Sequence, residues 1–308
     1  MLPTLSLQQL SDRWIIVGKL GKGTYARVYL ARPAQAATAP AEQVAVKRYK
    51  RIATPEYGLH EPLVRELSLL RRHQHPHLIR LYEICYASNT VCAILEYMPT
   101  TLELVLDAHP EPYAWTSARA VLVQVLRALA YLHSCRVVHR DVAVGNIFLS
   151  SPDLSSAIVK LGDLNLSRIQ TATMTPGMVT LNYRAPELMN DCEQYGPGVD
   201  VWACGCIAAE MVRGSVLFDG DSELEMLAEI LGTLGKPDPR LAKRLGINLK
   251  TMQRLLRRAQ ARLQGRGLAD RLHTDEAEAV KMIEAMLELD PDRRISAQQC
   301  LDCLDFTL

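Results

Sequence analysis

The hydrophobic pattern of this chain changes near residue 100, and this change limits the fold more than any other feature of the sequence. Before it, short runs rich in β-branched residues alternate with turn residues, as in WIIVGKL (14–20), RVYLA (27–31) and EQVAVKRY (42–49). After it, apolar residues recur at helical spacing in long segments, at 117–134, 199–213, 221–233 and 276–289. Strands gathered in one part of a chain and helices in another predict an α+β fold.

The strand-rich part also contains one amphipathic helical segment, EPLVRELSLLRR (61–72), in which Pro62 suits the first turn. Further strands near 78–86 and 91–97 complete a small sheet. We therefore expect a small lobe with a β-sheet plus one helix, and a larger lobe that is mainly α-helical. The expected boundaries are an N-terminal extension at 1–12, the small lobe at 13–98 and the larger lobe at 99–308.

The bulk composition is that of an ordinary globular protein. Hydrophobic residues make up 48% and charged residues 22%, which argues against disorder or a fibre. A net charge of +1 gives no electrostatic argument for binding nucleic acid or membrane. The longest apolar stretch, 120–132, is short and interrupted by Gln124 and Arg127, and the N-terminus lacks a signal-peptide pattern. We therefore expect an intracellular protein of the cytoplasm, the nucleus or both.

Eight cysteines are scattered along the chain, and two pairs have a spacing that metal sites also use. Cys204 and Cys206 lie in the apolar helical run VWACGCIAAEM, and Cys300 and Cys303 lie at the end of the chain. Reduced structural thiols explain these positions better than a zinc site does.

The stretch LGKGTYARV (20–28) places Gly21 and Gly23 between two predicted strands. Glycine lets a backbone approach a phosphate closely and donate amide hydrogens to it. A strand on both sides separates this loop from the strand-to-helix turn of a dinucleotide fold. Ala26 stands where a third glycine is usual, so a plain hairpin turn explains the motif alone about equally well.

Lys47 ends the apolar strand VAVK, and Glu66 follows nineteen residues later on the amphipathic helix. A lone lysine after a strand is usually solvated. A glutamate on the next helix is placed to pair with it and hold it on nucleotide phosphates.

The order of several motifs now matters more than any one of them. The glycine loop, VAVK, the helix glutamate, HRDVAVGN (139–146), GDLN (162–165) and RAPE (184–187) follow one another as in the eukaryotic protein kinases, which this chain resembles. DVWACGC (200–206) and DPDRRIS (290–296) extend the match over almost the whole chain. RELSLLRRHQHPHLIRL, MVTLNYRAPELM and LGTLGKPDP look like the cyclin-dependent kinase branch, whose relatives include the MAP kinases. The resemblance implies a two-lobed protein kinase fold of the α+β class, with a small antiparallel β-sheet lobe plus one helix and a larger, mainly α-helical lobe.

The resemblance also implies a binding site for ATP and Mg²⁺. It assigns the nucleotide to Leu20, Gly21, Gly23, Val28, Ala45, Lys47, Leu95, Glu96, Met98 and Phe148. Adenine would lie between Val28 and Ala45 on one side and Phe148 on the other, with Leu95 as gatekeeper. Backbone groups of Glu96 and Met98 would bond the base.

The same resemblance assigns five catalytic residues, namely Lys47, Glu66, Asp141, Asn146 and Asp163. Lys47, paired with Glu66, would hold the α- and β-phosphates. Asn146 and Asp163 would hold Mg²⁺, and Asp141 would accept or orient the proton of the substrate hydroxyl.

Control and substrate choice follow from further matching positions. Arg65, Arg140 and Arg168 correspond to three arginines that gather a phosphate, here on Thr175. Val179, Thr180 and Arg184 correspond to a pocket that suits proline after the phosphoacceptor. The expected activity is thus a proline-directed serine/threonine protein kinase that is activated by phosphorylation of Thr175.

Two departures keep an alternative open. Ala143 stands where serine/threonine kinases carry lysine, and Gly145 stands where some tyrosine kinases carry arginine. DLN (163–165) replaces DFG, so Asn165 stands where glycine is usual. Asparagine tolerates positive φ next best, so this change would bias the loop between its active and inactive positions without preventing the flip. The alternative is a pseudokinase scaffold that binds nucleotide and partners but transfers little or no phosphate.

The partners are expected to be protein substrates, with two open questions. The helix at 61–72 shares only its arginine–glutamate end with the cyclin-binding helix, so the sequence leaves a cyclin-like activating subunit open. Residues 240–266 contain nine lysines or arginines and no acidic residue. A solvated face explains this run, and an acidic docking partner is the alternative.

Overall fold

The computed structural model describes residues 13–23, 26–34, 42–50, 61–87, 90–170, 181–189, 195–247, 250–251, 253–257 and 267–305. The chain divides into two compact units. The small unit is Met1–Pro99 together with Gly162–Asn165, and the larger unit is Thr100–Leu161 together with Leu166–Leu308. The small unit holds the main β-sheet and the larger unit is mainly helical, which confirms the α+β fold that the hydrophobic pattern predicts.

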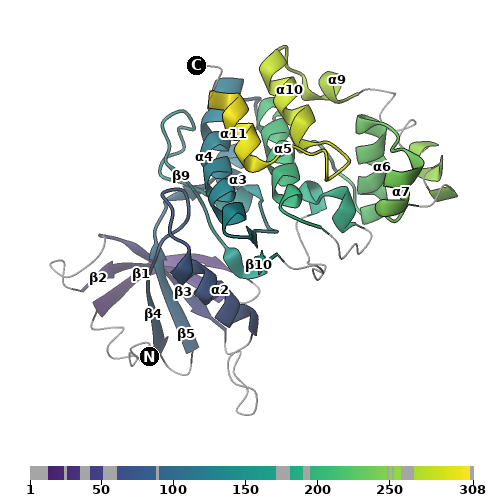
Figure 1. The fold of residues 1–308 in the computed structure, drawn as a ribbon. Coiled ribbons are helices and arrows are strands. Elements are labelled where there is room, and N and C mark those ends of the chain that lie inside the picture. Colours follow the sequence, from purple (N-terminus) through teal and green to yellow (C-terminus); the bar gives the residue numbers. More distant parts are fainter. Residues whose placement is uncertain are drawn as a thin grey trace. The chain divides into compact units, whose positions relative to one another are not determined.

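The small unit contains a five-stranded antiparallel sheet and one described helix (Figure 1). The sheet order is β1-β2-β3-β5-β4. Its strands are β1 (Trp14–Lys22), β2 (Ala26–Pro33), β3 (Val44–Tyr49), β4 (Leu81–Ala87) and β5 (Thr90–Glu96). The helix α2 (Glu61–Arg72) has the bounds that the sequence predicts.

The strand β3 shows how alternation sorts side chains to the two faces of this sheet. Val44 and Val46 join a buried cluster with Trp14 and Ile94. Tyr49 belongs to another cluster, which contains Leu63 and Leu67 of α2. Because successive side chains of a strand point to opposite faces, Lys47 points to the same face as Tyr49, the one that packs against α2.

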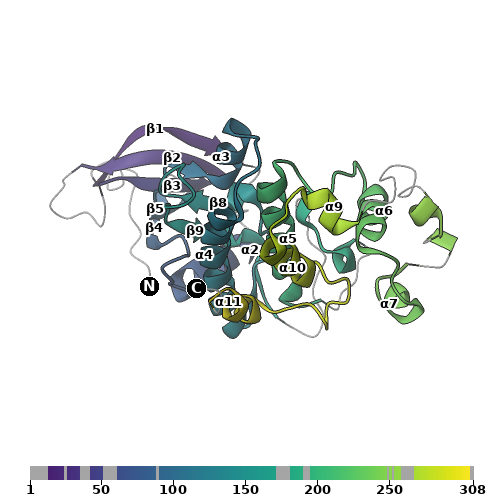
Figure 2. The same cartoon turned by 90° about the horizontal axis from the view of Figure 1, so that it is seen from above.

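The larger unit is built around two long helices, α4 (Trp115–Ser134) and α5 (Gly198–Arg213). Nearly all of α5 is buried, as expected for a helix that is apolar around its whole circumference. Figure 2 shows α4, α5, α10 and α11 packed together, and α4 contacts both α5 and α11. The other helices are α3 (Leu102–Ala108), α6 (Glu223–Leu234), α7 (Pro239–Arg244), α9 (Leu268–Leu272), α10 (Ala277–Met286) and α11 (Ala297–Asp305).

Short elements frame the segment that contains HRDVAVGN. The strand β7 (Val137–Val138) precedes it and pairs with β10 (Arg168–Ile169). The strand β8 (Ile147–Leu149) follows it and lies between β6 (Thr100–Thr101) and β9 (Val159–Leu161). Four 3₁₀ turns complete the described elements, at Val144–Asn146, Leu164–Leu166, Leu181–Tyr183 and Pro186–Leu188.

The packing around α5 is tight at Gly205. A Cβ atom there would lie 2.9 Å from the Met286 Cβ and 2.9 Å from the Leu287 Cδ2, closer than side-chain carbons approach in proteins. A glycine inside a helix costs about 1 kcal/mol relative to alanine. Here it permits the close approach of α5 to the end of α10.

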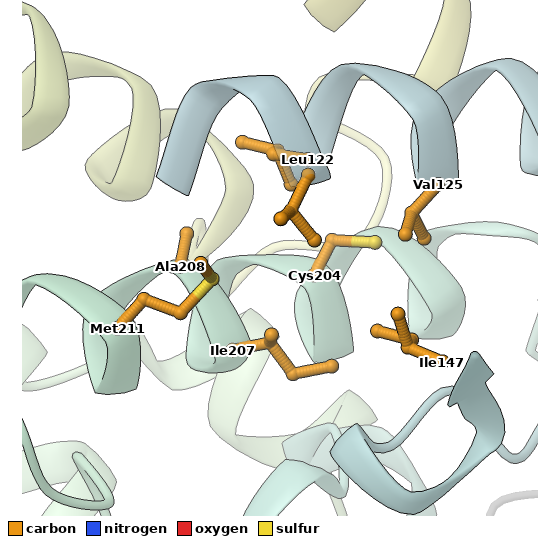
Figure 3. A pocket seen from close by; sticks show the side chains of 8 residues that line it. Leu122, Val125, Ile147, Cys204, Ile207, Ala208 and Met211 are labelled. Atoms are coloured by element: carbon orange, nitrogen blue, oxygen red, sulfur yellow. The ribbon is translucent and has the colours of Figure 1, made fainter. Parts of the chain in front are cut away.

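A small apolar gap lies between α4 and α5 (Figure 3). Its volume is about 10 Å³, at the lower limit for one water molecule, and its lining offers a water no good hydrogen-bonding partner. Figure 3 shows the Cys204 thiol directed toward Val125 of α4. Burial raises the pKa of the Cys204 thiol, so this thiol stays protonated and unreactive in the fold.

Among the helices of the described residues, none is long and apolar enough to cross a membrane.

Candidate active site

In the small unit, Lys47 lies between two carboxylates. Its Nζ is 2.7 Å from the Glu66 Oε1 and 3.0 Å from the Asp163 Oδ1. Lys47 comes from β3, Glu66 from α2, and Asp163 from the segment Gly162–Asn165. The ion pair that the sequence suggests between Lys47 and Glu66 is therefore formed, and Asp163 extends it to three groups.

Burial and charge oppose each other at this triad. Burial lowers the pKa of Lys47, but the charges of Asp163 and Glu66 more than offset it and raise that pKa overall. Burial raises the pKa of Glu66, and Lys47 only partly counteracts it. The lysine thus remains a cation, while the buried glutamate depends on it to stay ionised.

The backbone strain of the DLN segment lies at Asp163. Asp163 has φ of 60°, in the left-handed region, whereas Asn165 does not. Leu164–Leu166 forms a 3₁₀ turn in which Leu164 is buried. Asn165 therefore does not use its tolerance of positive φ in this conformation, and the strain falls on the aspartate itself.

The glycine loop lies in the β1–β2 hairpin. Leu20 and Gly21 belong to β1, Gly21 pairs with Val28, and the Gly23 amide donates to the Ala26 carbonyl at 2.9 Å. A Cβ on Gly21 would meet no atom within 4 Å, so the strand leaves open space there. Ala26 is buried in the cluster under α2, which explains a side chain where a third glycine is usual.

The remaining residues assigned to the nucleotide fall on both units. Val28 and Ala45 lie on β2 and β3, Leu95 and Glu96 end β5, and Met98 follows them, all in the small unit. Phe148 lies on β8 of the larger unit and is half-buried.

In the larger unit, Asn146 fixes the side chain of Asp141. The Asn146 Nδ2 donates to the Asp141 Oδ2 at 2.9 Å and to the Asp141 carbonyl at 2.8 Å. The backbone amide of Asn146 donates in turn to the Ala143 carbonyl at 2.9 Å. The amide group of Asn146 thus uses its nitrogen inside the loop, which leaves its oxygen as the atom suited to a hard cation.

One buried carboxylate, Asp200 at the start of α5, holds the beginning of the loop. It accepts hydrogen bonds from the backbone amides of His139 at 2.8 Å and Arg140 at 2.7 Å. The His133 Nε2 lies 2.8 Å from the same carboxylate. Burial raises the pKa of Asp200, but these hydrogen bonds and the nearby histidines lower it further than burial raises it.

Sequence reasoning did not assign this role to Asp200. The available signal was an acidic residue in the first turn of an otherwise apolar helix, within DVWACGC.

Ala143 and Gly145 stand at the two loop positions where other kinases carry a cation, and the structure shows what surrounds each of them. Ala143 is buried and extended. At Gly145, a Cβ would lie 3.1 Å from the Glu103 Oε2 of α3, so a carboxylate occupies the space beside this glycine.

Two of the three arginines assigned to phosphate recognition lie near one tyrosine in the larger unit. The Arg140 guanidinium lies 5.6 Å from the centre of the buried Tyr195 ring. Burial raises the pKa of Tyr195, and the charges of Arg140 and Arg168 act against it. Arg65 lies half-buried on α2 of the small unit. Thr175 lies outside the described residues.

Of the three residues assigned to the proline pocket, the structure describes Arg184. It pairs with Glu223 at the start of α6. Nearby in sequence, the Asn182 Nδ2 donates to the Phe218 carbonyl at 3.0 Å. Val179 and Thr180 lie outside the described residues.

A buried ion pair joins two of the quoted motifs, although the sequence did not indicate that they meet. Glu187 of RAPE accepts two hydrogen bonds from Arg294 of DPDRRIS, at 2.6 and 3.0 Å. Arg294 also donates to the Glu288 and Gly198 carbonyls and lies 5.0 Å from the Trp202 ring centre. Each of the three nitrogen atoms of this guanidinium therefore has a hydrogen-bond partner, as a buried charge requires.

The side chains present fit a magnesium nucleotide. Lys47 offers a cation to phosphate, while Asp163 and Asn146 offer the carboxylate and amide oxygens that Mg²⁺ prefers. Gly21 has the open space that a phosphate close to the backbone needs.

Comparison with known proteins agrees with this geometry. The model of the protein kinase domain family matches residues 14–304. The chain is 34% identical over 311 residues to the cell division control protein 2 homolog 3 of Trypanosoma brucei brucei, and the match covers 98% of this chain and 96% of that protein. The chain therefore belongs to the eukaryotic protein kinase family and is of the cyclin-dependent kinase type.

Proposed function

We propose that this chain transfers the γ-phosphate of ATP to serine or threonine residues of protein substrates, with Mg²⁺. The observation that carries the proposal is the Lys47 ammonium held between Glu66 and Asp163 at 2.7 and 3.0 Å. A scaffold that only binds partners has no need of this triad together with an Asp141 fixed by Asn146.

Phosphoryl transfer needs mostly positioning and charge neutralisation, and the residues divide these tasks. Lys47 holds phosphate oxygens, and Glu66 orients Lys47. Asp163 and Asn146 hold the metal through oxygen atoms. When bound, Mg-ATP supplies the transferable phosphoryl group and a metal charge against the phosphates.

Asp141 accepts or orients the proton of the substrate hydroxyl. Its carboxylate is held by the Asn146 amide at 2.9 Å, so it cannot rotate freely away from the substrate. The Asp200 carboxylate positions Asp141 indirectly, because it holds the two preceding backbone amides.

We assign the nucleotide-binding lobe to 13–98, preceded by an extension at 1–12, and the catalytic-loop and substrate-binding lobe to 99–308. In the small lobe, Leu20, Gly21, Gly23, Val28 and Ala45 serve the nucleotide, with Leu95, Glu96 and Met98 along the adenine. Phe148 of the larger unit is also assigned to the adenine.

The proposed control is phosphorylation of Thr175, recognised by Arg65, Arg140 and Arg168. Guanidinium groups bind phosphate through paired hydrogen bonds. The closeness of Arg140 and Arg168 to one tyrosine supports a common task for these two. Thr175→Ala should lower activity by about 5- to 150-fold, the usual range of a regulatory coupling. Full activity of this variant beside wild type would contradict the switch.

The proposed substrate preference is proline after the phosphoacceptor, through Val179, Thr180 and Arg184. The support is the sequence match in this segment and the pairing of Arg184 with Glu223, which fixes the arginine side chain. Protein partners are proposed to include a cyclin-like subunit at α2, whose Arg65–Glu66 end matches the cyclin-dependent kinases.

A transfer assay tests the activity. Purified protein is incubated with Mg-ATP and with matched Ser-Pro and Ser-Ala peptides, with Asp141→Asn as control. We expect transfer to the Ser-Pro peptide that Asp141→Asn loses. Equal transfer to both peptides would remove proline direction. Nucleotide-dependent thermal stabilisation without transfer, also after treatment with an activating kinase, would favour the pseudokinase scaffold.

A further inference from the structure

One helix face in the larger unit carries unpaired positive charge. Lys250, Gln253, Arg254 and Arg257 follow the i, i+3, i+4, i+7 spacing of a single helix side, and all four are exposed. They line a surface hollow of about 370 Å³. Leu255 is fully buried and anchors the helix from its other side. We call these four residues the basic face.

No acidic partner neutralises the basic face within the described part of the chain. Lys250, Arg254 and Arg257 make no ion pair there, and residues 240–266 contain no aspartate or glutamate. Arg244 on α7 is the contrast, since it pairs with Asp290 and Asp292. Among the described residues of this region, Arg244 is thus paired with carboxylates, whereas the three cations of the basic face are not.

The like charges of this face are slightly unfavourable for the helix when no anion is bound. Like charges three or four positions apart on a helix repel one another, as Lys250 and Arg254 do, and as Arg254 and Arg257 do. An anionic ligand would remove this repulsion. Because the whole chain has a net charge of only +1, its overall charge adds little to this local attraction.

We propose that the basic face docks an acidic segment of protein substrates, separate from the residue that is phosphorylated. The catalytic consequence rests on the proposed kinase function. The face is about 10 Å long, which an extended segment of about three residues matches. Arginine forks pair with carboxylates in two parallel hydrogen bonds, and the Gln253 amide can bond the peptide backbone.

The size of the face favours a peptide over nucleic acid. Nucleic-acid binding in protein complexes commonly uses about 6–10 phosphate contacts along an extended track. Three cations on one short helix give too few contacts for that. A tethered substrate, in contrast, gains from a weak second contact because tethering raises its local concentration.

The test compares two peptides that share a Ser-Pro phosphoacceptor and a glycine/serine linker. One carries a distal segment of aspartate and glutamate, and the other carries asparagine and glutamine in the same places. With wild-type protein we expect the acidic peptide to have a KM at least about tenfold lower at equal kcat. Arg254→Glu/Arg257→Glu should abolish this difference. The test does not need a charge reversal at Arg258, which lies outside the described residues.

The matched control is Arg127→Glu/Lys281→Glu, which changes the net charge equally at two exposed positions on α4 and α10. It should keep the KM difference, and Arg254→Lys/Arg257→Lys should keep most of it. Fluorescence anisotropy of the acidic segment alone, without a phosphoacceptor, gives a readout that does not depend on activity. Binding should weaken with added salt and disappear in the double reversal.

Several results would overturn the docking site. These are equal KM values for the two peptides with wild type, equal loss in the control reversal, or tighter binding of a short duplex DNA that the same reversal removes. If neither peptide is phosphorylated, the proposed kinase function fails, while the anisotropy measurement still decides the docking site.

Discussion

The two units hold their functional groups by different means. In the small unit, three charged side chains from β3, α2 and Gly162–Asn165 hold one another through ion pairs. In the larger unit, a single buried carboxylate holds the loop by its backbone amides, and a buried arginine–glutamate pair ties distant segments together. The difference teaches that the first arrangement fixes side chains by ion pairs among themselves, whereas the second uses buried charges to fix backbone and distant segments, so different substitutions should damage them.

The largest stability effect should come from Arg294→Ala in the larger unit. Removing this side chain leaves Glu187 as an uncompensated buried charge, which costs about 3–5 kcal/mol in the free energy of unfolding. Urea denaturation measures it. The neighbouring Arg293, whose side chain is 76% exposed, provides the control, and Arg293→Ala should change stability by less than about 1 kcal/mol. Similar losses in both variants would show that the buried pair has no special part in stability.

The charge dependence of the small unit is tested by Lys47→Met. Loss of the cation should lower the rate of phosphoryl transfer by about 10²–10³-fold while the fold is retained. Glu66 then loses its counter-ion, so its pKa rises further. A carboxyl group with a raised folded-state pKa costs more stability as the pH increases through that pKa, so the variant should become less stable toward neutral pH.

The matched control for this change is Lys281→Met at an exposed position of α10. It should affect neither transfer nor the pH profile of unfolding. A Lys47→Met protein with wild-type transfer would remove the small unit from the proposed mechanism.

The effect of the missing cation in the loop is tested by introducing a basic residue there. Ala143→Lys should increase kcat by about 10- to 100-fold, because a charge on the transferring phosphate lowers the barrier. Gly145→Arg should help less, since the Glu103 carboxylate lies beside that position and would pair with the new guanidinium. Steady-state kinetics of both variants decide the matter. A gain with Gly145→Arg alone would mean that Ala143 is not the site of the deficit.

The smallest effect concerns the pH dependence of the larger unit. Because the pKa of Asp200 is lowered from its usual 3.8, the ionised carboxylate stabilises the fold at neutral pH, and this stabilisation is lost as the pH falls through the lowered value. Asp200→Asn should cost about 1–3 kcal/mol at pH 7. The difference from wild type should shrink below about pH 4.

Unfolding curves measured from pH 7 to pH 3 test this prediction. Asp270→Asn, at an exposed position of α9, is the control and should stay within about 0.5 kcal/mol of wild type. A constant difference between Asp200→Asn and wild type over the whole range would contradict the role of the ionised carboxylate.

Local patterns predicted the elements well and their ends less well. The bounds of α2 agree fully, because the apolar spacing and Pro62 both lie within the helix. The helix α6 was expected at 221–233 and spans Glu223–Leu234, since the Ser222 hydroxyl accepts from the Glu225 amide and caps its start. The helix α10 was expected at 276–289 and ends at Met286. Such ends depend on individual capping contacts that periodicity does not contain.

The candidate site divides in the same way. The Lys47–Glu66 pair could be suggested because strand alternation and helix spacing are local. The Glu187–Arg294 pair joins residues 107 positions apart, and the hydrogen bond from the His139 amide to Asp200 joins residues 61 positions apart. Neither contact can be predicted without the three-dimensional fold. The carboxylate beside Gly145 was also invisible in sequence, because Glu103 is brought there by the packing of α3.

The Cys204 thiol beside the apolar gap can serve as a probe of local opening between α4 and α5. A reagent that alkylates thiols cannot react with it until α4 and α5 separate, because the sulfur is buried and stays protonated. The rate at which this one residue is labelled, followed by mass spectrometry, therefore reports how often the centre of the larger unit opens. Addition of nucleotide or partner would then be read as a change in that frequency, without any assay of catalysis.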